Sequence, residues 1–102
     1  MHFNKISKKL GLEENEYLEL VELFVETSKA DINDLRSAIN NKNIGMITGI
    51  AHSLKGAAMN LGLDDFVELA ELIEKTSFYG ELEETSKNVK IFQNKLDDLH
   101  DR

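Results

Sequence analysis

A histidine, His52, is followed by Lys55 and Gly56, which lie one helical turn further along the chain. A neutral imidazole is a nucleophile at physiological pH. An ammonium at i+3 can neutralise negative charge that arrives on the ring. A lone histidine lacks the partners of a hydrolytic triad, so this arrangement suits acceptance of a phosphoryl group from a docked partner.

A helical projection turns His52 away from the core. With Ile47 at zero and about 100° per residue, His52 falls near 140°. The predicted buried face comprises Ile47, Ile50, Ala51, Leu54, Ala57, Ala58 and Leu61. The side chains and bare backbone predicted to surround His52 are those of Gly45, Thr48, Gly49, Lys55, Gly56 and Met59.

Glycine within this helix needs an explanation, because each interior glycine costs about 1 kcal/mol relative to alanine. Bare backbone at Gly49 and Gly56 lets another molecule approach His52 closely. Two simpler explanations stay open at this point. A surface histidine is often only solvated, and the glycines could mark a frayed helix or one packed closely against another element.

Glycines and polar turns divide the chain into helical segments with no strand-like alternation. Gly62 is the predicted C-terminal cap of the helix that carries His52, and Asp65 with Glu68 reads as the capping box of the next one. The predicted helices are a short one ending near Gly11, then 15–41, 44–61, about 65–80, and 82 to the C-terminus.

These helices predict an all-α fold, an antiparallel up-down four-helix bundle with a short extra N-terminal helix. Residues 1–102 are expected to form a single domain. The apolar stripes supply its core, and because one bundle uses them fully, we expect a monomer. On the second helix the stripe is Leu18, Val21, Val25, Ile32, Leu35 and Ile39; on the fourth, Phe66, Leu69, Ala70, Leu72 and Ile73; on the last, Val89, Phe92, Leu96 and Leu99.

Composition excludes several classes of function. The net charge is −7, with 12 Lys and Arg against 19 Asp and Glu, which argues against binding to nucleic acid or an anionic membrane surface. The absence of cysteine removes disulfides, thiolate metal sites and cysteine nucleophiles. No stretch resembles a signal peptide or a membrane span, so we expect a cytoplasmic protein.

No other residues suggest a second kind of chemistry. No histidine or carboxylate stands at metal-ligand spacing around His52, so no metal site is predicted. The chain has no glycine-rich phosphate loop, so we expect neither an ATP site of its own nor a cofactor. His2 and His100 are interpreted as solvated, as is the charge of Glu74. Met59 is either rim packing or a docking contact.

The stretch AHSLKGAAMNLG resembles the signature of histidine phosphotransfer (HPt) domains, A-H-x-L-K-G followed by a short helical run to a glycine. The helices on either side, with YLELVELFVE before and LAELIEKTS after, are similar to those of the family. The resemblance extends from about Tyr17 onward. The residues that match the signature are Ala51, His52, Leu54, Lys55, Gly56 and Gly62.

The resemblance implies a phosphorelay intermediate in two-component signal transduction. His52 would accept a phosphoryl group, through Nε2, from an aspartyl phosphate on a receiver domain, and pass it to another receiver. Lys55 would hold the phosphoryl charge, and Gly56 would leave room for the partner. The expected partners are response-regulator receiver domains and a hybrid histidine kinase, with Mg²⁺ carried by the receiver. Thr48, Gly49 and Met59 are expected at the docking surface.

The family often has larger or basic residues before the histidine, where this chain has Gly45, Thr48 and Gly49. This difference leaves the choice of partner open. Two alternatives remain beside the relay. One is a helical adaptor that binds a receiver or kinase without transferring phosphate, although an adaptor needs neither His52 nor Lys55. The other is the phosphoacceptor domain of a larger histidine kinase.

Overall fold

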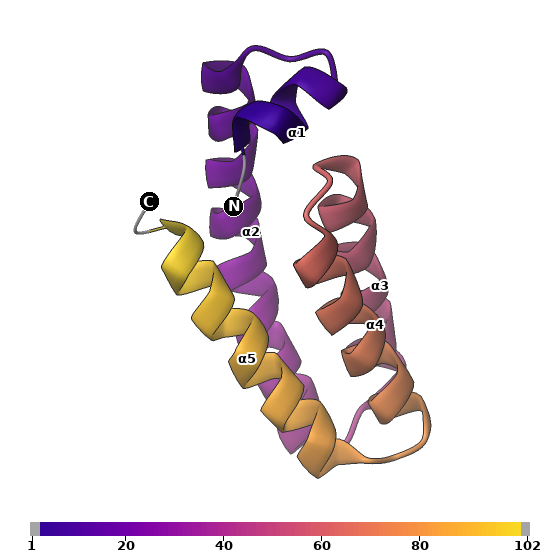
Figure 1. Ribbon diagram of the computed structural model, residues 1–102. Coiled ribbons are helices and arrows are strands. Elements are labelled where there is room, and N and C mark those ends of the chain that lie inside the picture. Colours follow the sequence, from indigo (N-terminus) through magenta and orange to yellow (C-terminus); the bar gives the residue numbers. More distant parts are fainter. Residues whose placement is uncertain (1–2, 101–102) are drawn as a thin grey trace.

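The computed structural model describes residues 3–100, with the backbone alone for His100, and this part of the chain is all-helical. Four long helices follow a short one, and each lies beside the next along the chain (Figure 1). The all-α prediction is confirmed for the described residues. The helices are α1 (Phe3–Lys9), α2 (Glu14–Asn40), α3 (Ile44–Asn60), α4 (Asp64–Phe78) and α5 (Leu82–His100).

The helices enclose one core. α3 packs against α4, α4 against α5, and α2 closes the arrangement by contacting both α3 and α5. α1 contacts α2 near one end of the molecule (Figure 1), where the Phe3 and Tyr17 rings lie 5.7 Å apart. Because α3 and α4 pack side by side, solvent-facing residues of the two helices can contact each other.

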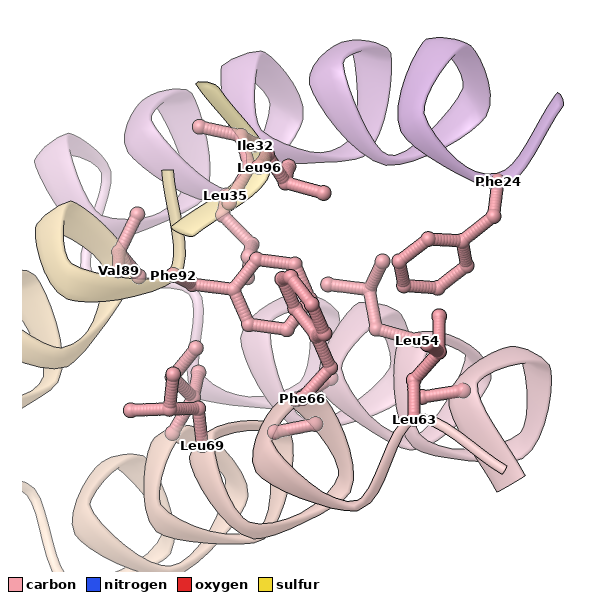
Figure 2. Packing of buried hydrophobic residues seen from close by; sticks show 14 of the residues in the cluster. Phe24, Ile32, Leu35, Leu54, Leu63, Phe66, Leu69, Val89, Phe92 and Leu96 are labelled. Carbon is pink, nitrogen blue, oxygen red and sulfur yellow. The ribbon is translucent and has the colours of Figure 1, made fainter. Parts of the chain in front are cut away.

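Three aromatic rings from three helices occupy the middle of the core (Figure 2). Phe66 of α4 packs edge-on against Phe24 of α2, with ring centroids 5.4 Å apart, and against Phe92 of α5 at 5.1 Å. This geometry is favoured because the positive edge of one ring meets the negative face of the next. Phe66 thus joins α2, α4 and α5, and it is almost completely buried.

The predicted stripes are confirmed at their centres and wrong at their edges. Val89, Phe92, Leu96 and Leu99 are all buried, as predicted for α5. Leu18 and Leu72 are exposed, and so is Ala57 of the face predicted as buried in α3. Each of these three lies at the margin of its stripe, where the neighbouring helix no longer covers the side chain.

The start of α4 differs from the prediction. Leu63 occupies the N-cap position, without a side-chain cap, and Asp65 lies inside the first turn. The buried Leu63 side chain starts the helix early, so Asp65 cannot cap it. The Asp65 carboxylate instead lies 3.6 Å from the Lys95 ammonium of α5. Asp64 and Asp65 still favour this end electrostatically, because the helix dipole is positive there.

The end of α3 is fixed from two directions. Gly62 has a φ of +68°, a conformation in which residues with a side chain are strained, and a Cβ there would lie 3.1 Å from Ile6 of α1. The buried Tyr17 hydroxyl donates a 2.6 Å hydrogen bond to the Leu61 carbonyl. Burial raises the pKa of Tyr17, which keeps the hydroxyl protonated as a donor. The predicted role of Gly62 as the cap is confirmed.

Asp31 of α2 is half-buried, and burial, followed by the nearby charge of Asp34, raises its pKa above the ordinary value. A carboxyl with a raised pKa in the folded state favours folding below its ordinary pKa, and this advantage is lost as the pH rises through the raised value. At neutral pH the ionised Asp31 therefore destabilises the fold. Asp31→Asn is expected to raise stability at pH 7 by less than about 0.5 kcal/mol, because solvent screens the charge.

Thermal unfolding at pH 7 and near pH 3 checks this expectation. The gain should be present at pH 7 and absent near pH 3, where the carboxyl is protonated in both states. Asp97→Asn on the exposed side of α5 is the matched control. A gain from Asp31→Asn that is equal at both pH values contradicts the electrostatic explanation.

Candidate functional site

His52 lies in the middle of α3 and projects into solvent, with 71% of its side chain exposed. The core-facing residues of the same helix, Ile47, Ala51 and Leu54, are almost completely buried. This division follows from the helical period, which places His52 roughly opposite the buried stripe. The predicted outward direction of His52 is confirmed, and the ring is open to approach by a large molecule.

Glu74 of α4 lies beside the histidine. Its Oε2 is 3.4 Å from Nδ1 of His52, within ion-pair range and slightly longer than an ordinary hydrogen bond. The interpretation of Glu74 as a merely solvated charge is wrong, because only 32% of its side chain is exposed and both carboxylate oxygens have partners. No motif in the sequence marked Glu74, although it lies on the helix that follows the histidine.

Lys55 completes the cluster. Its ammonium lies 3.5 Å from Oε1 of Glu74, while its aliphatic stem packs down so that the side chain is only 23% exposed. The predicted pair of His52 and Lys55 thus lies in one cluster, but with a carboxylate between them. Glu74 contacts the ring through one oxygen and the ammonium through the other.

Among the described residues, the glycines near His52 have no packing role. A Cβ added to Gly49 or Gly56 would meet nothing within 4 Å, and one added to Gly45 would make only an ordinary contact with the Asn43 side chain. Close packing of helices therefore does not explain Gly49 and Gly56. Alanine would suit the helix better at both positions, so packing among the described residues gives no reason for glycine there.

Thr48 and Met59 flank the histidine in different ways. Thr48 is partly buried, and its hydroxyl donates back to the carbonyls of Ile44 and Gly45 at 3.1 Å each. This local bond leaves Thr48 little capacity to donate to a partner. Met59 is largely exposed and offers an adaptable apolar contact. The structure places both residues on the helix of His52.

Within residues 3–100, no three histidine, aspartate or glutamate side chains come together in a way that could hold a metal ion. No helix in that range has the length and apolar character needed to cross a membrane. The predictions for His2 and for the His100 side chain lie outside the described residues.

The cluster of Glu74, His52 and Lys55 has the parts of a nucleophilic acceptor. A carboxylate 3.4 Å from Nδ1 favours the tautomer that carries the ring proton on that nitrogen, as in other sites where an acid supports a histidine. In that tautomer the lone pair is on Nε2, which would be the nucleophilic nitrogen. Lys55 adds a cation one turn away, where an anionic group bonded to the ring would arrive. Together with the helical bundle, these features define a class of histidine phosphoacceptor modules.

Comparison with known families agrees with that class. The Hpt domain family model matches residues 19–102, which include the four long helices except the start of α2. The chain therefore belongs to the Hpt domain family, as the resemblance of its signature predicts. Membership implies a histidine phosphotransfer role in two-component signalling. No curated protein and no solved structure gives a significant match to the chain.

Proposed function

We propose that the protein is a phosphorelay intermediate that accepts a phosphoryl group on Nε2 of His52 from a receiver-domain aspartyl phosphate. The observation that carries this proposal is the largely exposed His52 ring with the Glu74 carboxylate 3.4 Å from Nδ1, which favours the tautomer with its proton there and its lone pair on Nε2. In the transfer, the Nε2–P bond forms while the P–O bond to the aspartate breaks. The electron pair of that bond goes to the aspartate carboxylate.

The partner supplies the rest of the machinery. Phosphoryl transfer proceeds through a loose transition state, so positioning and charge neutralisation provide most of the catalysis. A receiver domain would bring the aspartyl phosphate and the Mg²⁺, and a hybrid histidine kinase or another receiver would complete the relay. Lys55 would pair with the phosphoryl oxygens, and Gly56 would admit the partner. Thr48, Gly49 and Met59 would surround this contact.

The proposed function also implies an architecture. We infer that the four long helices alternate in direction, as an up-down bundle, and that residues 1–102 act as one domain. A monomer suits the role, because a relay must present His52 to two partners in turn. The contact with each receiver is expected to be small and transient.

The direct test is phosphoryl transfer from a panel of phosphorylated receiver domains to the purified protein. The expected product carries label that is lost in acid and retained in base, as phosphohistidine is. Binding to a receiver without transfer would favour the adaptor. The absence of both label and binding from every receiver would count against the relay and direct the search to a kinase domain as donor.

Gly56→Ala separates folding from docking. The added methyl group meets no atom of the chain, so we expect the helix to become more stable by about 1 kcal/mol. We expect phosphoryl transfer from the receiver to slow at the same time, by about tenfold, because the methyl group occupies space that the partner needs. Chemical denaturation and transfer kinetics on the same preparation measure the two effects.

Exposed Ala57 provides the control for this prediction. Ala57→Gly changes the same helix by one methyl group in the opposite sense, and it should destabilise the helix without slowing transfer. If Gly56→Ala transfers at the normal rate, bare backbone at this position is not what the partner requires.

A further inference from the structure

The Glu74 carboxylate contacts both His52 and Lys55, and phosphorylation of His52 would change the electrostatics of both contacts. In the unphosphorylated protein it lies 3.4 Å from Nδ1 of His52 and 3.5 Å from the Lys55 ammonium. These contacts come from two helices, since Glu74 is on α4 and the other two residues are on α3. A phosphoryl group bonded to Nε2 would therefore add a second anion to a site where one carboxylate already contacts both the ring and the ammonium.

The first consequence concerns the ring. An imidazole that keeps its proton on Nδ1 and gains a phosphoryl group on Nε2 carries a positive charge. A carboxylate beside Nδ1 stabilises that charge, as an acid does beside the imidazolium of a catalytic triad. The protonated ring is also the better leaving group, because it departs as neutral imidazole when the Nε2–P bond breaks. Glu74 therefore favours the reactive form of phosphohistidine.

The second consequence concerns the lysine. A phosphoryl group on His52 would be a strong anion one helical turn from Lys55, but Glu74 competes for the same ammonium. While Lys55 remains on Glu74, the phosphoryl charge is less neutralised. The two anions also repel one another across a short distance. Both effects raise the free energy of the phosphorylated state relative to a site with a neutral side chain at position 74.

We propose that Glu74 sets the lifetime of the phosphohistidine, by keeping the proton on Nδ1 and by withholding Lys55 from the phosphoryl group. This inference rests on the proposed function of His52. Glu74 acts through the two neighbouring side chains, so it is a positioning residue for transfer. The phosphoryl group is held in a state from which it leaves readily, to a receiver aspartate or to water.

Loss to water provides a measurement that needs no partner. Water attacks phosphorus, the Nε2–P bond breaks, and its electron pair stays on Nε2. The water oxygen and both its protons leave in inorganic phosphate, while the ring keeps the proton on Nδ1. The rate of this step reports how readily the site releases the phosphoryl group.

The experiment loads the full-length protein with phosphoramidate, a small phosphoryl donor, and follows the decay of phosphohistidine at one neutral pH. Glu74→Gln keeps the shape of the side chain and removes its charge. We expect the half-life to lengthen about fivefold, the size typical of a charge effect that solvent screens. Glu71→Gln, at an exposed position one turn earlier on α4, is the matched control and should leave the half-life unchanged.

Two further readouts distinguish this role from a purely structural one. Long-range proton–nitrogen spectra of unphosphorylated His52 should show the proton on Nδ1 in the wild type and a smaller share of that tautomer in Glu74→Gln. Lys55→Gln combined with Glu74→Gln should shorten the lengthened half-life, because no ammonium remains to reach the phosphoryl group.

The possible results separate this inference from the proposed function. If neither phosphoramidate nor any phosphorylated receiver loads His52 of the wild type, the proposed function fails and this inference falls with it. If His52 is loaded but Glu74→Gln decays as fast as the wild type, or faster, the role of Glu74 is overturned and the proposed function stands. An unchanged tautomer ratio in Glu74→Gln also overturns the role assigned to the carboxylate.

Discussion

His52→Gln is expected to abolish phosphoryl acceptance. The glutamine amide has a similar size and polarity, but its nitrogen lone pair is delocalised into the carbonyl and does not attack phosphorus. The remaining residues of the cluster, Lys55 and Glu74, are an ammonium and a carboxylate that act on the ring and do not replace it. We therefore expect loss of all detectable label, not a partial decrease, in transfer from a phosphorylated receiver.

The fold should tolerate this substitution. His52 is mostly exposed, so its replacement should change the free energy of unfolding by no more than about 0.5 kcal/mol. Receiver binding should also persist, because the glycines and Met59 are unaltered. A thermal melt and a binding measurement on the same variant establish both points. Acid-labile label that remains on His52→Gln would show that another residue is the acceptor.

Phe66→Ala is expected to produce the largest loss of stability. The ring is buried between Phe24 and Phe92, and its removal deletes two edge-to-face contacts and leaves a cavity. Replacement of a buried phenylalanine by alanine usually costs about 3–5 kcal/mol. A domain of this size has a total stability of about 5–15 kcal/mol. The variant should therefore unfold at a much lower urea concentration than the wild type.

Phe78 offers a control of the same residue type. It lies on the same helix, α4, but 71% of the residue is exposed at the C-terminal end. Phe78→Ala should shift the urea midpoint little, by an amount equivalent to about 0.5 kcal/mol or less. The denaturant slope should stay the same in both variants if each changes only the folded state. Equal losses in the two variants would mean that the Phe66 ring is not central to the core.

Phe66 and Glu74 lie on the same helix, α4. Phe66 anchors this helix in the core, and Glu74 projects from the same helix toward His52. A folded Phe66→Ala protein should still accept phosphate, because His52 belongs to α3. The rate of phosphohistidine decay in this variant should change only if the cavity shifts α4, and with it Glu74, relative to α3.

The sequence by itself determined the features that depend on one helix. The period of α3 put His52 opposite Ile47, Ala51 and Leu54, and the signature around His52 identified the family. The stripe of α5 was correct throughout, and α3 was predicted as 44–61 and found as Ile44–Asn60. These features follow from spacing along the chain, because neighbours one turn apart on a helix are fixed by its geometry.

The tertiary structure decided what depends on two helices at once. Glu74 is 22 residues beyond His52 in the sequence, and its contact with the ring depends on how α3 and α4 are rotated and aligned against each other. The same packing buries Leu63, so α4 begins at Asp64 and not at the predicted Asp65 cap. It also leaves Ala57 exposed. A helical period gives the direction of each side chain from its own axis, but the position of one axis relative to another is set by the packing of the whole core.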